Sequence, residues 1–281
     1  MKKILPAILL ALLFILTASS VGYAADIQMK VDGVTILAEV KPEMKNNRMM
    51  VPLRVISENV GANVHWSGTE VALTKNDRKI VLTLNSDKAV FNGKTVLLDA
   101  KPYLKDNRLF VPLRFLAQSF GCTVNYSHTT VSVDTKPFYI DGVQVAAVQE
   151  EIQMTMGSIV DELQGHAYIE TMYNLLMQNK GNEVEAPARI SLNVHNRLPG
   201  DYDQVVQIDF VGENGDSITS FGLYAEVPSE GEDEGEPKVV IYAETEKRWY
   251  AFSSKASQEI WELNAIAGKN GFLTMISNTT P

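Results

Sequence analysis

The sequence contains a repeat with an offset of 60 residues. Residues 44–61 read MKNNRMMVPLRVISENVG, residues 104–121 read LKDNRLFVPLRFLAQSFG, and the two segments align without a gap. Eight of the 18 aligned positions are identical. A unit of this size cannot bury its own apolar face, so two copies normally pack together as one domain. The repeat therefore predicts a duplicated strand-helix-strand module over residues 26–135.

Each copy predicts a short helix followed by a strand. Pro52 and Pro112 suit the first helical turn, where the backbone N–H has no partner. Apolar residues then recur on one helical face, namely Leu53, Ile56 and Val60 in the first copy and Leu113, Leu116 and Phe120 in the second. Gly61 and Gly121 fit a left-handed helix cap, because glycine adopts positive φ without steric cost. The period then changes to two, which indicates a strand.

The repeated string Asn-Arg-x-x-Val-Pro-Leu-Arg occupies residues 47–54 and 107–114. Together with the short helix, the glycine and the alternating strand that ends in an aromatic residue, it resembles the copper amine oxidase N-terminal-like domain, also called a stalk domain. The resemblance covers about residues 27–135. It implies a small α+β module, common in exported proteins of Gram-positive bacteria, that acts as a spacer or contact surface. In the oxidases that lend the name, this module lies outside the catalytic core.

The sequence does not contain the catalytic signature of those oxidases. Their quinone derives from a tyrosine in an Asn-Tyr-Asp/Glu context, and their copper is held by three histidines, two of them as His-x-His. Here Ser127 follows Asn125-Tyr126. The four histidines are all far apart in the sequence, at His65, His128, His166 and His195. We therefore expect no copper, no other metal and no cofactor.

Residues 1–24 resemble an export signal. Lys2 and Lys3 form a positive start, and a short apolar segment follows. This segment is brief for a membrane span of about 20 residues, and Gly22-Tyr23-Ala24 supplies the small residues that a signal peptidase reads. We predict cleavage after Ala24, no transmembrane segment in the mature chain, and a secreted, extracellular protein that can associate with the cell wall.

The net charge limits the kinds of partner that the chain can bind, and the cysteine content limits disulfide formation. The formal net charge is −9, and loss of Lys2 and Lys3 makes it −11. Such a chain lacks the basic field that attracts nucleic acid. Cys122 is the only cysteine, so no intrachain disulfide can form. Its alignment with Ala62 indicates a small core residue rather than a nucleophile.

Residues 138–281 predict a second α+β domain. Apolar residues spaced by three and four predict a helix over residues 146–163 and another over residues 169–176, which together form a helical hairpin. Five segments rich in β-forming residues predict an antiparallel meander, at 190–194, 205–211, 217–225, 239–243 and 249–252. A short helix over residues 257–267 and a strand over residues 272–276 complete the domain. No family resemblance is found in this half.

Arg54 and Arg114 are the first candidate ligand contacts. Both fall in a first helical turn, where a positive charge opposes the helix dipole, so both must gain something else. They either bind carboxylates or sulfates of a wall polymer, or donate to turn carbonyls or an acid of the same repeat. We favour the internal role, because a guanidinium suits fixed contacts with several acceptors.

Trp249 and Tyr250 are the other candidates, because neighbouring strand residues point to opposite faces and one ring must lie outside.

Carboxylates that could form a hydrolase pair are Asp161 with Glu162 and Asp201 with Asp203. However, no hydrolase motif such as Gly-x-Ser-x-Gly or His-Glu-x-x-His is present, and no catalytic residue is assigned. We expect a non-enzymatic binding or scaffold protein whose partner is a cell-wall polymer or an exported protein. The alternative is an extracellular hydrolase with its site in the C-terminal domain.

Overall fold

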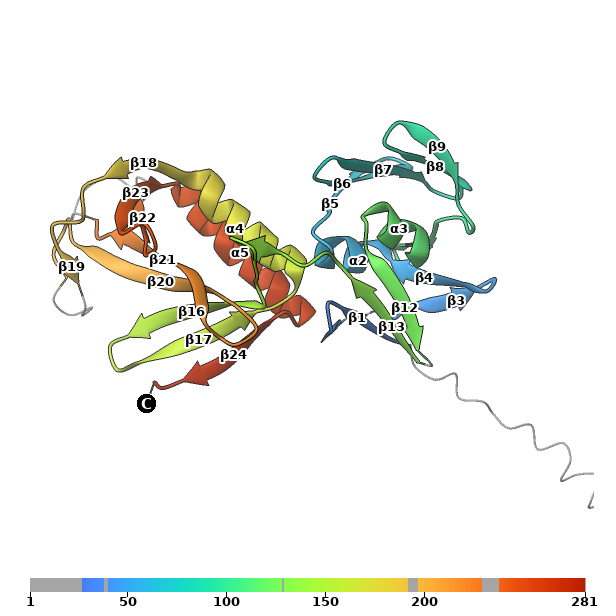
Figure 1. The fold of residues 1–281 in the computed structure, drawn as a ribbon. Coiled ribbons are helices and arrows are strands. Elements are labelled where there is room, and N and C mark those ends of the chain that lie inside the picture. The colour runs from blue at the N-terminus through green and yellow to red at the C-terminus, as the bar shows by residue number, and fades with distance from the viewer. Residues whose placement is uncertain (1–26, 38–39, 128, 192–196, 229–237, 281) are drawn as a thin grey trace, which may run out of the picture.

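The computed structural model describes residues 27–37, 40–127, 129–191, 197–228 and 238–280. The expected export signal, residues 1–24, lies outside these residues. The described chain has a mixed fold of four helices and predominantly antiparallel sheets. Figure 1 shows an N-terminal part (residues 27–135) beside a C-terminal part (residues 138–280).

Two short helices and thirteen strands are described in the N-terminal part. In chain order these are β1 (Gln28–Val31), β2 (Val34–Thr35), β3 (Glu43–Lys45), β4 (Arg48–Pro52), α2 (Leu53–Asn59), β5 (Asn63–Ser67), β6 (Glu70–Lys75), β7 (Arg78–Thr83), β8 (Lys88–Phe91), β9 (Lys94–Leu97), β10 (Tyr103–Lys105), β11 (Arg108–Pro112), α3 (Leu113–Ser119), β12 (Thr123–Ser127) and β13 (Thr130–Asp134). The order β3-β4-α2-β5 recurs 60 residues later as β10-β11-α3-β12.

Strands from the two sequence repeats share sheets. β4 pairs with β11 in the sheet β10-β11-β4-β3, where Val51 lies opposite Val111. β1 pairs in parallel with β13, which joins the start of the N-terminal part to its end. Strands β5 to β9 form a third sheet in sequence order. The two repeats therefore share one core, in which Val51, Val111, Ile56 and Leu116 are fully buried.

Both helices end as the glycine positions predict. Gly61 and Gly121 have φ of 73° and 78°. The next residue donates its N–H back into the helix, from Ala62 to Ser57 O at 2.7 Å and from Cys122 to Ala117 O at 2.9 Å. These are Schellman caps, which satisfy carbonyls that the helix itself leaves unpaired. Pro52 and Pro112 stand one position before the first helical residue, as the last residues of β4 and β11.

The hairpin of β6 and β7 supports the same two helix ends from the side. Lys75 Nζ donates to Val60 O at 2.6 Å, and Arg78 NH1 donates to Ser119 O at 2.7 Å. A positive charge is favourable at a helix C-terminus, where the peptide dipoles leave partial negative charge. Two basic residues of one hairpin therefore hold α2 and α3 together.

In its described residues, the C-terminal part consists of a large sheet, a separate two-stranded sheet and two helices. Its elements are β14 (Tyr139–Ile140), β15 (Val143–Gln144), β16 (Ala147–Met154), β17 (Gly157–Leu163), α4 (His166–Asn179), β18 (Lys180–Val184), β19 (Ile190–Ser191), β20 (Tyr202–Val211), β21 (Ser217–Glu226), β22 (Val239–Ala243), β23 (Arg248–Phe252), α5 (Ser254–Asn270) and β24 (Leu273–Asn278). The nine-stranded sheet has the order β18-β23-β22-β21-β20-β16-β17-β24, with β19 beside β20. The antiparallel meander is confirmed for β20 to β23. The strand expected at 190–194 is wrong as a member of it, because β19 pairs in parallel with β20, and residues 192–194 lie outside the described residues.

The expected helix over residues 146–163 is wrong, and so is the helical hairpin. These residues form the hairpin of β16 and β17. The apolar residues that suggested a helical stripe are cross-strand pairs, Val148 with Leu163 and Ile152 with Ile159. A spacing of four is even, so it also places residues on one face of a strand. The neighbour of α4 is α5, which comes from the far end of the chain and lies along it (Figure 1).

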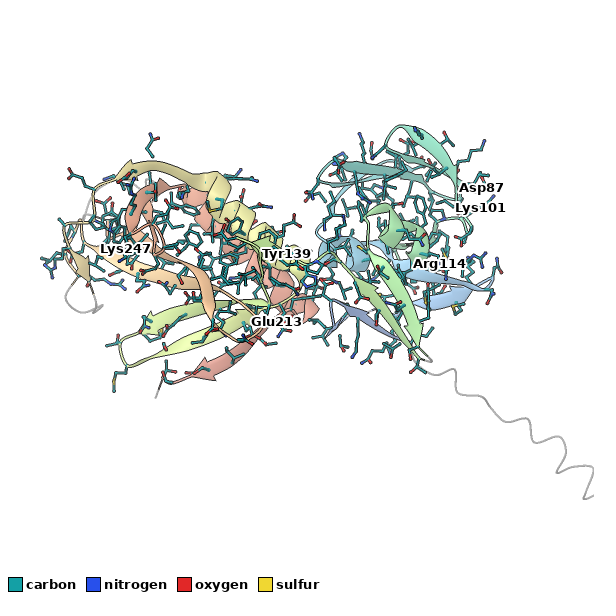
Figure 2. All side chains as sticks on the ribbon, in the orientation of Figure 1. Asp87, Lys101, Arg114, Tyr139, Glu213 and Lys247 are labelled. Atoms are coloured by element: carbon teal, nitrogen blue, oxygen red, sulfur yellow. The ribbon has the colours of Figure 1, made fainter. Side chains whose placement is uncertain are left out.

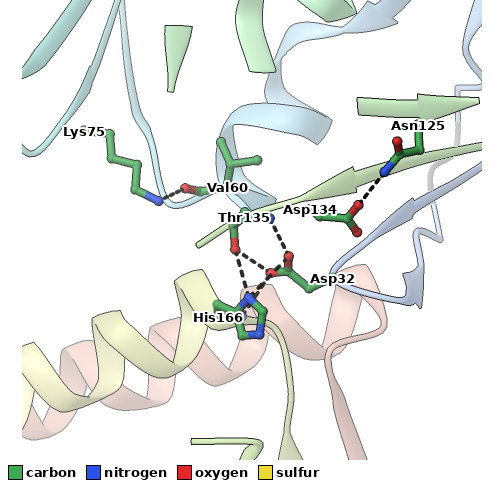
Figure 3. A network of polar contacts seen from close by, with 7 residues as sticks. All are labelled: Asp32, Val60, Lys75, Asn125, Asp134, Thr135 and His166. Atoms are coloured by element: carbon green, nitrogen blue, oxygen red, sulfur yellow. Dashed lines mark hydrogen bonds and ion pairs between the residues drawn. The ribbon is translucent and has the colours of Figure 1, made fainter. Parts of the chain in front are cut away.

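A buried carboxylate joins the two parts. The Asp32 side chain, which is 1% exposed, comes from the turn between β1 and β2. It accepts the backbone N–H of Thr135 at 2.7 Å, the Thr135 hydroxyl at 2.8 Å and the backbone N–H of His166 at 3.0 Å (Figure 3). The last contact satisfies an N–H at the start of α4, where the preceding residue, Gly165, has no side chain to do so.

A second chain of hydrogen bonds crosses the same junction. The Tyr168 hydroxyl of α4 donates to Asn59 Oδ1 of α2 at 2.8 Å and accepts from Asn270 Nδ2 of α5 at 3.1 Å. Beside it, a side chain at position 61 would have little room, because a Cβ added to Gly61 would lie 3.2 Å from the Ala167 Cβ. The start of α4 is therefore seated on the end of α2.

We predict that Asp32→Ala destabilises the protein by about 3 kcal/mol, because three hydrogen bonds to one buried charge are lost. The unfolding midpoint in urea measures the change. Asp141→Ala is the matched control, because Asp141 also precedes a glycine in a turn, has the same φ of 49° and is exposed. Equal destabilisation by both variants contradicts a special role for Asp32.

Candidate functional site

Arg54 and Arg114 occupy equivalent positions, the second residues of α2 and α3, and both side chains are exposed. The Arg54 side chain is 82% exposed, and its Nε lies 3.6 Å from Glu58 Oε1 one helical turn later. This acid belongs to the same repeat and is one of the partners considered above for an internal role of Arg54. An exposed pair of this kind contributes little to stability, but it balances the charge of Arg54.

Arg114 has different surroundings because the repeat is not conserved one turn later. The residue aligned with Glu58 is Gln118. No acid pairs with Arg114 among the residues that the structure describes. Its guanidinium carbon instead lies 5.6 Å from the centroid of the Tyr126 ring, a distance at which a cation is attracted to the face of an aromatic ring. Tyr126 is 47% exposed, so this pair lies at the surface.

Arg114 and Tyr126 line a cavity of about 290 Å³. Arg48 and Asp99 form another part of its wall as an ion pair, with Nε and Oδ2 2.5 Å apart. Methionine side chains of β3 and β4, Met44 and Met49, add apolar surface. Figure 2 shows Arg114 on the side of the N-terminal part that faces away from α4 and α5.

The cavity can bind an anionic group. Arg48 and Asp99 compensate each other, so Arg114 leaves one positive charge in excess among these side chains. A guanidinium presents several N–H donors in a plane and suits two-point contact with a carboxylate or phosphate. Met44, Met49 and Tyr126 can at the same time contact an apolar portion of the ligand. We name this feature the Arg114 cavity.

The charge of the chain is divided unequally between its parts. Residues 27–135 contain 14 Lys and Arg against 10 Asp and Glu, a net charge of +4. Residues 138–281 contain 8 against 23, a net charge of −15. The acidic total therefore conceals a basic N-terminal part. Such a part attracts polyanions while the other is repelled by them.

Trp249 and Tyr250 lie in the other part of the molecule and do not meet the arginines. Trp249 contacts Tyr224 and Tyr242, with ring centroids 4.9 and 4.8 Å apart. Tyr250 lies opposite the buried Ile241 and packs against the core. The two rings are on opposite faces of β23, as strand geometry predicts. Both are partly buried, so neither stands free as a ligand contact.

The carboxylates considered as hydrolase pairs are held apart or have structural partners. Asp161 and Glu162 follow each other on β17 and therefore point to opposite faces. Asp201 accepts the backbone N–H of Leu198 at 2.9 Å and lies 3.4 Å from Arg189 Nε. Asp203 pairs with Arg197 Nε at 2.7 Å. No three His, Cys, Asp or Glu side chains come together as a possible metal site within the described ranges.

Cys122 is 7% exposed and borders a second cavity, of about 310 Å³, between the two parts. Burial raises the pKa of the Cys122 thiol to about 11. The thiolate is the reactive form, so burial and the raised pKa both disfavour reaction at Cys122. Its burial agrees with the core role read from the repeat. Lys75 and Arg78 also line this cavity, but each already donates to the carbonyl end of a helix.

Comparison with known proteins finds a match to one family. Residues 30–135 match the family model of the copper amine oxidase N-terminal domain. The rest of the chain has no family match. The family of this N-terminal domain is non-catalytic. No curated protein and no solved structure matches the chain. No helix of the described residues is long and apolar enough to cross a membrane.

Sequence reasoning identified Arg114 but not the cavity around it. The cavity needs Arg48 and Asp99 from loops and strands whose proximity only the fold reveals. One signal was available, since the change from Glu58 to Gln118 removes the acid from the second copy alone.

We predict that Cys122 resists a thiol reagent such as Ellman's reagent in the native protein at pH 8, because its pKa of about 11 and its burial keep the thiolate scarce. Labelling should proceed only as fast as the protein opens, and added urea should accelerate it in step with unfolding. Rapid stoichiometric labelling of the folded protein contradicts this assignment.

Proposed function

We propose that the protein is an exported, non-enzymatic binding and scaffold protein. In this proposal, residues 1–24 direct export, the N-terminal part is a duplicated stalk module that contacts an anionic polymer of the Gram-positive cell envelope, and the C-terminal part is a separate domain held away from that surface. The observation that carries the proposal is Arg114, a surface guanidinium without an acidic partner among the described residues, lining a cavity with Tyr126.

Three features support the proposal. The net charge of +4 on residues 27–135 favours approach to a polyanion, and the charge of −15 on residues 138–281 turns the other part away. The buried Asp32 carboxylate bonds to both parts, and such contacts favour the fixed spacing that a spacer requires. The family matched by residues 30–135 is non-catalytic.

The first test is co-sedimentation of the full mature chain with purified Gram-positive cell wall. We expect retention that weakens as salt is added, because screening shortens the reach of exposed charges. Arg114→Gln should reduce retention several-fold. Arg54→Gln is the matched control, because Arg54 has the same helix position but already pairs with Glu58, and it should leave retention nearly unchanged. Equal retention of both variants and the parent rejects the Arg114 cavity as the contact.

A second pair of variants exchanges the local environments of the two arginines. Gln118→Glu gives Arg114 an acid one helical turn later, as Glu58 does for Arg54, and should lower wall retention without removing a basic residue. Glu58→Gln frees Arg54 and should not lower it. The two changes alter net charge in opposite directions, so each has its own control at an exposed strand position: Glu70→Gln on β6 for Glu58→Gln, and Gln28→Glu on β1 for Gln118→Glu. If Gln118→Glu leaves retention intact, the local balance of charge at Arg114 is irrelevant.

Export is tested separately by mass spectrometry of the protein released by expressing cells. We expect an N-terminus at Ala25. An intact N-terminus on the released protein rejects cleavage after Ala24 and leaves the wall-contact test unaffected.

A further inference from the structure

A buried acid and a buried amide meet between α5 and the sheet. Glu150 of β16 is 4% exposed and Asn264 of α5 is 7% exposed. Asn264 Nδ2 donates to Glu150 Oε2 at 2.7 Å. The other oxygen of each group, Glu150 Oε1 and Asn264 Oδ1, has no hydrogen-bond partner, and these two are the only such buried side-chain atoms among the described residues.

Adding one proton to Glu150 allows the two unpaired oxygens to form a hydrogen bond with each other. An ionised carboxylate and an amide oxygen are both acceptors, so Oε1 and Oδ1 cannot bond to each other in that state. A protonated carboxyl has one O–H donor. Placed on Oε1, that proton lets Glu150 donate to Asn264 Oδ1 while Oε2 continues to accept from Nδ2. A single proton thus pairs both orphaned acceptors and removes a buried charge, each of which is costly otherwise.

The neighbours of Glu150 do not compensate a negative charge. On β17, the residue directly opposite is Asp161, another acid. On β20, the residue opposite is Ile208, which is fully buried and apolar. On α5, the contact is the neutral Asn264. Burial is the largest influence on the pKa of Glu150 and raises it. The hydrogen bond from Asn264 lowers it by less, repulsion from Asp161 adds a smaller rise, and the resulting pKa is about 7.

We propose that Glu150 is a neutral carboxylic acid in the folded protein, forming a reciprocal two-bond pair with Asn264 that fastens α5 to the sheet and opens as the pH rises above neutrality. The pair is a proton-dependent contact between α5 and the sheet of the C-terminal part. Glu150 and Asn264 are 114 residues apart in the chain, so the stability of the pair reports on the packing of α5 and not on local structure.

The sign of the pH dependence follows from linkage. The folded protein binds this proton more tightly than the unfolded chain, whose carboxyl has the ordinary pKa of 4.5. The contribution of the pair is therefore complete below about pH 4.5 and is lost as the pH rises through about 7. Across that interval the folding equilibrium constant should fall by a factor on the order of 100 from this group alone.

Glu150→Gln is the decisive variant, because a glutamine keeps the shape of the protonated acid and can bond reciprocally to Asn264 at any pH. We expect the parent protein to lose stability between pH 5 and pH 8.5, and Glu150→Gln to lose markedly less and to be the more stable of the two at pH 8.5. Every other ionisable group is the same in both proteins, so the difference between the two urea-unfolding profiles isolates Glu150. Glu151→Gln, on the opposite face of β16, is the matched control and should follow the parent.

A spectroscopic measurement keeps the proposal testable if a variant folds poorly. Infrared spectra of the parent at pH 6 should contain a carboxylic-acid C=O band that weakens as the pH passes 7 and is missing from Glu150→Gln. Parallel pH profiles of parent and Glu150→Gln, or no protonated-acid band sensitive to this substitution, overturn the proposal.

Discussion

The carboxylate of Asp32 determines how the two parts of this protein are connected. It lies in a two-residue turn, yet it bonds to the end of β13 and to the start of α4. A buried charge is tolerated only when donors surround it, so Thr135 and His166 must both be in place when Asp32 is buried. The first hairpin of the chain thereby fixes the segment by which the chain leaves the N-terminal part.

Secondary structure is predicted best from the sequence at positions where few residue types can adopt the required backbone conformation. Gly61 and Gly121 ended their helices as expected because few other residues adopt positive φ there. Residues 146–163 were misread because Val148 and Ile152 are separated by four positions, a number that fits a helix and a strand equally. Only the partners of these residues across the turn, Leu163 and Ile159, decide between the two. Long-range pairing therefore settled what local periodicity could not.

In the candidate sites, too, the sequence predicts some features and long-range contacts decide the others. Identity at positions 54 and 114 suggested a common role, but their neighbours at positions 58 and 118 differ, and this difference gives the two arginines different contacts. The pairing of Glu150 with Asn264 had no sequence signal, because nothing in either residue's neighbourhood indicates that a strand and a distant helix bring them together. Similarity within a repeat predicts architecture, whereas its departures indicate where chemistry can differ.

The contacts at the junction affect how the uneven charge of the two parts can act. A basic part with net charge +4 joined by a flexible linker to a part with net charge −15 is attracted to it, and the nearest polyanion is then its own partner domain. The contacts of Asp32 and Tyr168 hold one relative placement, in which Arg114 lies on the side away from α4 and α5 (Figure 2). At physiological salt, charges farther apart than about 8 Å are largely screened. In the proposed function, this separation leaves the charge of Arg114 available to an external anion instead of being neutralised within the molecule.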